Sequence, residues 1–332
     1  MTKHHRVTLN GQTFQARSGQ VLLDAAMVAG TDIPHDCRAG RCGTCITRVT
    51  KGLTLGGETL QRGMVHACQA RVFSDLDLSV EALPAVSQIQ ARIVSLVDVT
   101  PDVVELEIAP ATRLKLFPGQ YCRFAFRGFP ERAFSPTAPL DGSEAGGNFR
   151  LNIKRVRNGR VSTNLGGKIK PGHALTIHGP FGHAFLRPRQ SNRLVLVAGG
   201  TGFAPMWAIG DAALREHPWR EIVLIAGARH VKQLYMLPAL DLVRRFPNVT
   251  VIATAEAAQR AGPVVGLGRP SDHLPRLRAS DIVYAAGAPA MVDAVAETAT
   301  AAHATFYADP FEPAGGQAED WITKAVSWLR TG

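Results

Sequence analysis

The feature that most constrains this chain is a set of four cysteines near its N-terminal end. They follow the spacing C-x4-C-x2-C-x22-C, and three of them lie within HDCRAGRCGTC. Because only one further cysteine occurs, this pattern indicates metal ligation in a reducing compartment rather than a disulfide scaffold. A loop with three thiolates must curl tightly, and Gly40 and Gly43 permit positive φ there. The expected metal ligands are Cys37, Cys42, Cys45 and Cys68.

The spacing also bears on which metal is held. Zinc sites are usually built from two C-x2-C pairs, whereas here the last cysteine stands alone. The spacing is that of plant-type ferredoxins, so we favour a 2Fe-2S cluster, with structural zinc as the alternative. Asn10-Gly11 indicates a hairpin, and an apolar helical run after Ser18 ends at Gly30. Residues 1–83 resemble the ferredoxin domain fused to many bacterial oxygenase reductases, which implies a β-grasp fold.

Length and charge limit the class of protein. A chain of 332 residues with 45% hydrophobic content predicts two or three cores, and we expect three. The N-terminus lacks the apolar core of a signal peptide and the apolar runs are strand-sized, so we expect a cytoplasmic protein without membrane contact. The net charge of +10 comes from scattered basic residues, which argues against nucleic acid as a partner. A protein partner with an acidic docking face explains the net positive charge better.

The middle of the chain predicts an all-β unit. Residues 84–90 carry a proline and no charge, which is typical of a short linker. Residues 91–188 contain six short β-rich segments separated by turns, which predict an antiparallel barrel. Within them, ERAFSPTAP and NGRVSTNL resemble the R-x-Y-S signature and the phosphate-contacting G-x-x-S segment of the ferredoxin–NADP reductase superfamily. The first alone could be a structural turn; together they imply an FAD-binding domain.

This resemblance assigns flavin contacts. Arg132 would pair with the flavin pyrophosphate, for which its planar guanidinium is suited. Phe134 would stack on the isoalloxazine, where the family usually has tyrosine, and the missing phenol is expected to weaken flavin retention. Ser135 would reach the N5 region that receives the hydride, so Phe134 and Ser135 are the expected catalytic residues. The other expected flavin contacts are Asn152, Ile153 and Lys154 beside the ribityl chain, and Ser162 with the backbone amides of Val161 and Thr163 at phosphate.

Residues 192–313 alternate strands, turns and helices, which predicts a doubly wound α/β sheet. RLVLVAGGTGFAPMWAIG indicates a strand, a Gly-rich turn and a helix, an arrangement that presents backbone amides to a pyrophosphate. A lone Gly-rich turn is a weak signal, but GGTGFAP resembles the nucleotide-binding turn of the same superfamily. The expected contacts in this turn are Gly199, Gly200, Thr201 and Gly202.

Three later segments complete the expected nucleotide site. The turn at 287–289 resembles the C-G-x-P motif that lies against the nicotinamide, with Ala286 in place of its cysteine. Basic residues after the second strand, without a neighbouring carboxylate, would accept a 2′-phosphate, so NADPH is slightly favoured over NADH; a solvated basic loop is the alternative. FYADPFEP resembles the closing aromatic segment of these reductases. The residues concerned are Gly287, Ala288, Pro289, Arg229, Lys232 and Phe311, the last near the flavin.

The signatures follow one another in the order ferredoxin, flavin, nucleotide, and a helical extension is expected at 314–332. Together they resemble the reductase components of Rieske-type aromatic-ring dioxygenases and demethylases, especially those for naphthalene or terephthalate. This implies an NAD(P)H-dependent oxidoreductase that passes electrons through FAD and a 2Fe-2S cluster to a terminal oxygenase or a separate ferredoxin. A reductase of a di-iron monooxygenase or deoxysugar dehydratase would carry the same modules. The alternative of another class is a redox-sensing or electron-carrying binding module without turnover.

Overall fold

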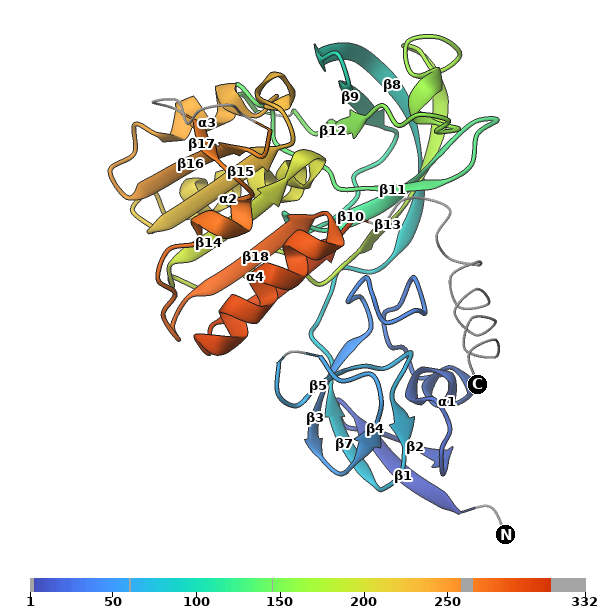
Figure 1. Ribbon diagram of the computed structural model, residues 1–332. Coiled ribbons are helices and arrows are strands. Elements are labelled where there is room, and N and C mark those ends of the chain that lie inside the picture. The colour runs from blue at the N-terminus through green and yellow to red at the C-terminus, as the bar shows by residue number, and fades with distance from the viewer. Residues whose placement is uncertain (1–2, 60, 145, 258–264, 312–332) are drawn as a thin grey trace, which may run out of the picture.

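The chain folds into three units in sequence order, and each unit has a hydrophobic core (Figure 1). The computed structural model describes residues 3–59, 61–144, 146–257 and 265–311. The expected extension at 314–332 lies outside these residues. Within the described ranges, no helix has the length and apolar character needed to cross a membrane.

The N-terminal unit is a mixed sheet packed on one helix, with the β-grasp topology expected of a ferredoxin domain. Asn10 (φ 47°) and Gly11 (φ 87°) make the tight turn of its first hairpin, as the sequence predicted. The strand order is β2-β1-β7-β3-β5, and β1 and β7 are parallel. Leu22 and Leu23 of the helix are buried against the sheet. The elements are β1 (His4–Leu9), β2 (Gln12–Arg17), α1 (Leu22–Val28), β3 (Ile46–Lys51), β4 (Thr54–Leu55), β5 (Met64–His66), β6 (Arg71–Val72) and β7 (Leu76–Ser79).

The second unit is an antiparallel six-stranded sheet with the order β11-β10-β13-β8-β9-β12. An isolated bridge between Thr137 and Arg150 joins the segment after β11 to β12, which brings the two edges of the sheet together as in a barrel. Alternation along β10 buries Cys122, whose thiol packs in the core. The elements are β8 (Ser87–Thr100), β9 (Val103–Pro110), β10 (Tyr121–Phe126), β11 (Arg132–Phe134), β12 (Phe149–Lys154), the short 3-10 helix η1 (Ser162–Asn164) and β13 (Ala174–Phe181).

The connection between these two units lies earlier in the chain than the expected linker 84–90. Strand β8 already begins at Ser87, and its first residues pair with β13, Ile89 lying opposite Ile177. The alternating pattern SQIQA therefore continues the strand, so that only 80–86 is irregular.

The third unit is a parallel sheet with the order β17-β16-β15-β14-β18-β19, as the alternating pattern predicted. Helices α2 and α3 pack on one face and α4 on the other, because successive residues of the central strand point to opposite cores. The elements are β14 (Leu194–Gly199), η2 (Gly200–Gly202), α2 (Phe203–Glu216), β15 (Ile222–Ala228), η3 (Val231–Gln233), α3 (Leu237–Val243), β16 (Val249–Ala255), β17 (Val265–Leu267), η4 (Pro270–His273), β18 (Ile282–Gly287), α4 (Pro289–Ala301) and β19 (Thr305–Pro310).

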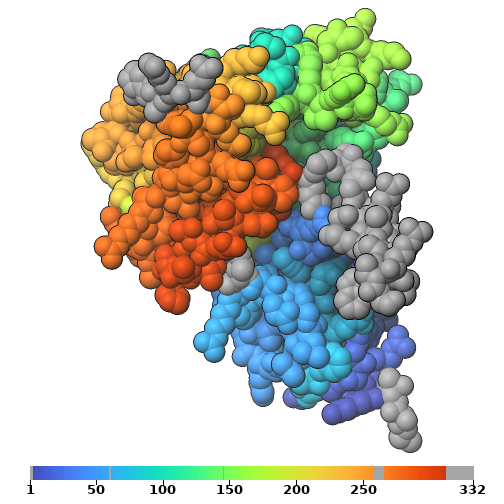
Figure 2. All heavy atoms as spheres, in the orientation of Figure 1, coloured from blue at the N-terminus to red at the C-terminus, as the bar shows by residue number. Residues whose placement is uncertain are grey.

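The barrel and the parallel sheet share apolar contacts. Val103, Ala184 and Leu186 belong to the same buried cluster as the helices of the third unit. The Trp207 indole donates a 3.1 Å hydrogen bond to the carbonyl of Pro139, and the Tyr284 hydroxyl bonds the Phe185 carbonyl at 2.8 Å. The N-terminal unit lies below both in the view of Figure 2.

Candidate functional site

The cluster-binding loop curls as its glycines predict. Gly40 and Gly43 have φ values of 70° and 71°. The curl directs the backbone N–H groups of Ala39 and Cys42 at the sulfur of Cys37, each at 3.4 Å. Donors aimed at sulfur favour the anionic thiolate form that binds metal.

The four thiols gather as two pairs, one made by Cys37 and Cys42 and the other by Cys45 and Cys68. The Cys42 thiol contact and the loop amides lower the pKa of Cys37 to about 5, while burial raises the pKa of Cys45 to about 12. Among the described residues, no three ligands of the His, Cys, Asp or Glu type form a site for a single ion. Two neighbouring pairs of thiols fit a cluster in which each of two irons takes two cysteines.

The expected flavin residues lie on β11 and just beyond it. The Phe134 ring is half-buried and meets the ring of Phe124, their centroids 6.0 Å apart. Ser135 is buried, and Arg132 is half-buried with its guanidinium bonded to the carbonyl of Glu131 at 2.8 Å. Aromatic, hydroxyl and cationic groups are thus presented in succession along one edge of the barrel.

A buried side chain on β12 has unpaired polar atoms that a cofactor beside this strand could bond. Asn152 is 6% exposed, yet its amide nitrogen and oxygen have no hydrogen-bond partner among the residues that the structure describes. Unpaired buried amide atoms are costly unless a further group bonds them. Asn152 is one of the expected flavin contacts, and a polar cofactor beside β12 would satisfy both atoms.

The side chains of the expected phosphate segment are engaged within the barrel. The Ser162 hydroxyl accepts the N–H of Val156 at 3.0 Å, and Thr163 donates its hydroxyl to the Gly159 carbonyl at 2.6 Å. Both side chains therefore stabilise the turn η1, while Val161 is buried in the barrel core. The side chain of Ile153 is likewise buried. Phosphate contacts from this segment would be made by backbone amides or by the remaining bonding capacity of the hydroxyls.

The Gly-rich turn and the turn after β18 touch through their backbones. A Cβ at Gly202 would lie 2.2 Å from the carbonyl oxygen of Ala286, and one at Gly287 would lie 2.8 Å from that of Gly199. Only glycine allows this approach at the carboxyl edge of the sheet, the usual ligand-binding edge of such folds. Gly200, with φ 56°, turns the chain into α2.

A cleft of about 600 Å³ opens at this edge, between the parallel sheet and the barrel. Of the residues expected from the sequence, it is lined by Lys154, Gly199, Gly200, Thr201, Arg229, Gly287, Ala288 and Phe311. Gly202, Lys232 and Pro289 are not among the lining residues. Lys154, expected beside the flavin, lines the cleft from the barrel side and lies 3.7 Å from Asp102.

Family models match the same three parts of the chain. A 2Fe-2S iron-sulfur cluster binding domain matches residues 7–73, an oxidoreductase FAD-binding domain residues 90–185, and an oxidoreductase NAD-binding domain residues 196–297. The ferredoxin–NAD(+) reductase component of the alkene monooxygenase system of Xanthobacter autotrophicus is 30% identical over 312 residues, covering 87% of this chain and 94% of the relative.

The chain belongs to the family of ferredoxin–NAD(P)(+) reductase components. The reductase component of the naphthalene 1,2-dioxygenase/salicylate 5-hydroxylase systems of a Ralstonia species is 33% identical over 301 residues, covering 85% of this chain and 89% of that protein. The crystal structure of the Amycolatopsis cytochrome P450 reductase GcoB superposes with a TM-score of 0.68 at 26% identity, over 94% of this chain and all of that one.

As a ferredoxin–NAD(P)(+) reductase, the protein is an oxidoreductase that uses a 2Fe-2S cluster, FAD and NAD(P)H. The cysteines supply the thiol chemistry that the cluster needs, and the orphaned amide of Asn152 and the glycine-lined cleft suit the two nucleotides. The sequence predicted these cofactors from motif order, and the three matches confirm them.

Sequence reasoning missed Asp309, which lies at the centre of this reductase. Its carboxylate on β19 accepts a 3.2 Å hydrogen bond from the Ser135 hydroxyl, so it joins the nucleotide unit to the residue expected at the flavin N5. Burial raises the pKa of Asp309 to about 7, against the opposing effect of the Ser135 bond. An isolated aspartate in ADPF carries no sequence signal, because its partner is far away in the chain.

Three other residues that the sequence analysis missed line the cleft, namely Asp102, Gln233 and Glu256. The Gln233 side chain of η3 donates a 2.7 Å hydrogen bond to Asp102, which precedes β9 and also faces Lys154. Glu256, at the end of β16, lines the same cleft and approaches Arg269 at 4.0 Å. The end of β16 and the start of η4 thus add a carboxylate and a further cation to the cleft that Arg229 lines, which the sequence near position 229 did not reveal.

The raised pKa of Asp309 predicts a pH-dependent stability. Because the folded-state pKa lies above that of an unfolded chain, the carboxyl stabilises the fold most below about pH 4 and loses this contribution as pH rises through 7. In flavin-depleted protein, Asp309→Asn should gain stability over wild type by up to about 1.4 kcal/mol per pKa unit of the shift, and the gain should be larger at pH 8 than at pH 5.

Urea unfolding of wild type and variant at both pH values measures this difference. Asp293→Asn, which changes an exposed carboxylate on α4, is the matched control and should show no such pH-dependent gain. An Asp309→Asn gain that does not change with pH would contradict the raised pKa.

Proposed function

We propose that the protein is the reductase component of an oxygenase system, passing electrons from NAD(P)H to a Rieske-type terminal oxygenase or to its separate ferredoxin. The bound flavin would accept two electrons as a hydride and release them one at a time, and the cluster would carry single electrons onward. Relatives that serve a dioxygenase and a monooxygenase resemble the chain about equally, at 33% and 30% identity. A di-iron monooxygenase therefore remains the second candidate acceptor.

The observation that carries this proposal is the spatial order of the candidate sites. Ser135 of the barrel contacts Asp309 of the nucleotide unit at 3.2 Å, and β19, which carries Asp309, leads directly to Phe311 in the lining of the cleft. Strand β11 that leads to Ser135 pairs with β10, and β10 bonds the loop that holds Cys37. The nucleotide cleft, the flavin edge and the thiol loop thus adjoin one another in the order in which electrons would travel.

The proposed roles of individual residues follow from this order. Arg132 would neutralise the flavin pyrophosphate, Phe134 would cover the isoalloxazine, and Ser135, which bonds Asp309, would lie at N5. Asn152 bonds the polar part of the flavin, in keeping with its two unpaired amide atoms. The units are proposed as 1–83 for the ferredoxin domain, 91–188 for the flavin domain with β8 reaching back to 87, and 192–313 for the nucleotide domain.

An anaerobic titration with NADPH and NADH tests the proposed path. Flavin absorbance should bleach, and a rhombic EPR signal of a reduced 2Fe-2S cluster should then appear at low temperature. A protein reconstituted with both cofactors that shows neither change would favour the binding module without turnover. Bleaching of the flavin without the EPR signal would contradict electron transfer from the flavin to the cluster.

We infer that the cleft prefers NADPH because two arginines, Arg229 and Arg269, line it against the carboxylate of Glu256, which the sequence did not place there and which lies 4.0 Å from Arg269. Removing a charge-assisted hydrogen bond to a 2′-phosphate costs about 1.5–3 kcal/mol, so Arg229→Ala should raise the KM for NADPH about tenfold or more and leave the KM for NADH unchanged. Steady-state dye reduction measures both. The control is Arg276→Ala, an exposed arginine of the same unit outside the cleft. Equal effects on both nucleotides would contradict the inference.

An acidic docking face on the acceptor is proposed from the charge of the units. Residues 91–188 contain fourteen Lys and Arg against seven Asp and Glu, and Arg38 and Arg41 are exposed on the thiol loop. If these charges steer association, electron delivery to the acceptor should slow by about tenfold or more as salt rises. Reduction of a small neutral dye should not change. Salt-independent delivery to the acceptor would contradict an acidic face.

A further inference from the structure

The carboxylate that precedes the first cysteine leaves its own unit and bonds the barrel. Asp36 accepts a hydrogen bond of 2.5 Å from the Tyr121 hydroxyl and pairs with the Arg123 guanidinium at 2.6 Å. Its side chain is only 9% exposed. A carboxylate held between a phenol and a guanidinium makes two charge-assisted hydrogen bonds, which are stronger and more directional than neutral ones.

The two partners lie beside the candidate flavin site. They flank Cys122 on β10, and Cys122 is the register partner of Phe134 on β11. Residues opposite each other in an antiparallel pair lie about 5 Å apart. Asp36 therefore ties the residue next to a proposed cluster ligand to the strand next to the proposed flavin-stacking ring.

Other contacts show which side of the loop faces the barrel. The Thr44 hydroxyl accepts the N–H of Gly182 at 2.9 Å, and a Cβ on Gly43 would lie 3.1 Å from the Cβ of His183. On the opposite side of the loop, the stretch 38–39 is exposed. One side of the loop is thus turned to the flavin unit while the other is open to an acceptor.

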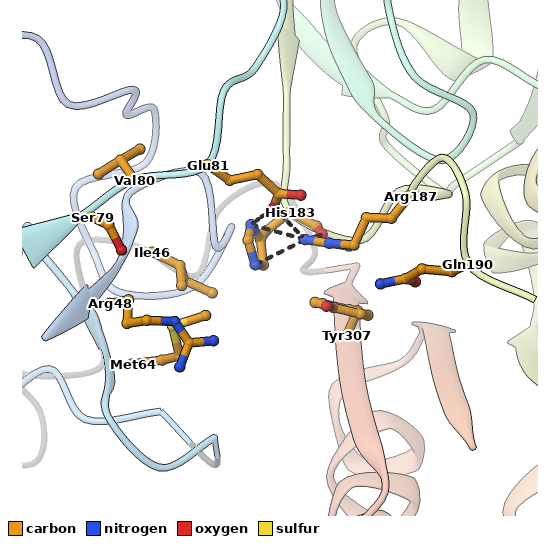
Figure 3. Close-up of a pocket in the computed structure, with 10 residues that line it drawn as sticks. All are labelled: Ile46, Arg48, Met64, Ser79, Val80, Glu81, His183, Arg187, Gln190 and Tyr307. Carbon is orange, nitrogen blue, oxygen red and sulfur yellow. Dashed lines mark hydrogen bonds and ion pairs between the residues drawn. The ribbon is translucent and has the colours of Figure 1, made fainter. Parts of the chain in front are cut away.

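Elsewhere the N-terminal unit is separated from the other two by a cavity of about 320 Å³ (Figure 3). Arg48 and Met64 lie on one side of it, and Tyr307 on the other. The space is crossed at its rim by the ion pair of Glu81 and Arg187 at 2.9 Å. Because this part of the interface is hollow and polar, directional bonds rather than apolar burial must set how the thiol loop is oriented.

We propose that Asp36 is a positioning residue for electron transfer: its bonds to Tyr121 and Arg123 hold the thiol loop against the barrel in the arrangement that lets electrons pass from flavin to cluster. The inference rests on the proposed path through both cofactors. It assigns no chemical step to Asp36, which acts only through the position of the loop.

Rapid mixing of the fully loaded protein with NADPH under anaerobic conditions tests the role of Asp36. Asp36→Asn keeps the size of the side chain but removes the ion pair. Bleaching of the flavin should keep its wild-type rate, while the appearance of the reduced-cluster EPR signal should slow about tenfold, equivalent to about 1.4 kcal/mol. Glu131→Gln is the matched control, since it removes the other carboxylate of Arg123, at 3.2 Å, and leaves Asp36 in place.

A variant on the barrel side separates docking from cluster assembly. Arg123→Gln breaks the same pair without changing the thiol loop, and it should slow cluster reduction to a similar degree. The double variant should be about as slow as either single one, because both remove one interaction. Iron content and the shape of the EPR signal after chemical reduction should stay as in wild type.

Hydrogen exchange supplies a readout that does not depend on turnover. The Gly182 amide donates across the interface to Thr44, so its exchange in the oxidised protein should speed up in Asp36→Asn and Arg123→Gln but not in Glu131→Gln.

Wild-type rates of cluster reduction or unchanged exchange at Gly182 in both docking variants would overturn the inference. Loss of iron in Asp36→Asn together with normal transfer in Arg123→Gln would also overturn it. Failure of NADPH to bleach the flavin in wild type would instead count against the proposed function.

Discussion

Hydride transfer between two bound nucleotides requires that the barrel and the parallel sheet hold one fixed arrangement. The interface between these two units, which is partly apolar, provides this fixed arrangement and is called the seam below. Val103 and Leu186 of the barrel are buried in the core of the nucleotide unit, and Trp207 bonds back to Pro139. The 3.2 Å bond of Ser135 with Asp309 lies at the end of this seam. Apolar burial sets the distance between the barrel and the nucleotide unit, and the directional hydrogen bonds set their relative orientation.

The N-terminal unit is held to the barrel by hydrogen bonds and ion pairs rather than by a shared apolar core. Its contacts are polar: Asp36 with β10, Thr44 with Gly182, and Glu81 with Arg187, beside a cavity of about 320 Å³. Such an interface orients a loop well but contributes little burial, which suits a carrier that must meet one partner inside the protein and another outside it. The rigid seam and the polar contact thus match the two kinds of transfer that the family performs.

The sequence predicted the three units because each carries a local signal. The cysteine spacing, the Asn10-Gly11 turn and the strand–turn–helix pattern around Gly200 depend on neighbours in the chain, and all were found as expected. The expected linker 84–90 overlaps the first residues of β8, which begins at Ser87, since strand pairing with β13 is a long-range event. Asp309, Asp102 and Glu256 could not have been found in this way, because a single carboxylate has no period and its partner is distant in the chain, in another unit for Asp309 and Asp102.

The sequence by itself determined the cofactors, since the thiolate spacing of the cluster and the short motifs that resemble flavin- and nucleotide-binding turns lie in nearly consecutive residues. Only the tertiary structure decided how the cofactor sites adjoin: that Ser135 meets Asp309, that Lys154 faces the nucleotide cleft, and that the carboxylate of Asp36 reaches β10. The reason is that these contacts depend on how three separately folded cores pack, and burial and hydrogen bonding between distant segments leave no mark in the local pattern of either one.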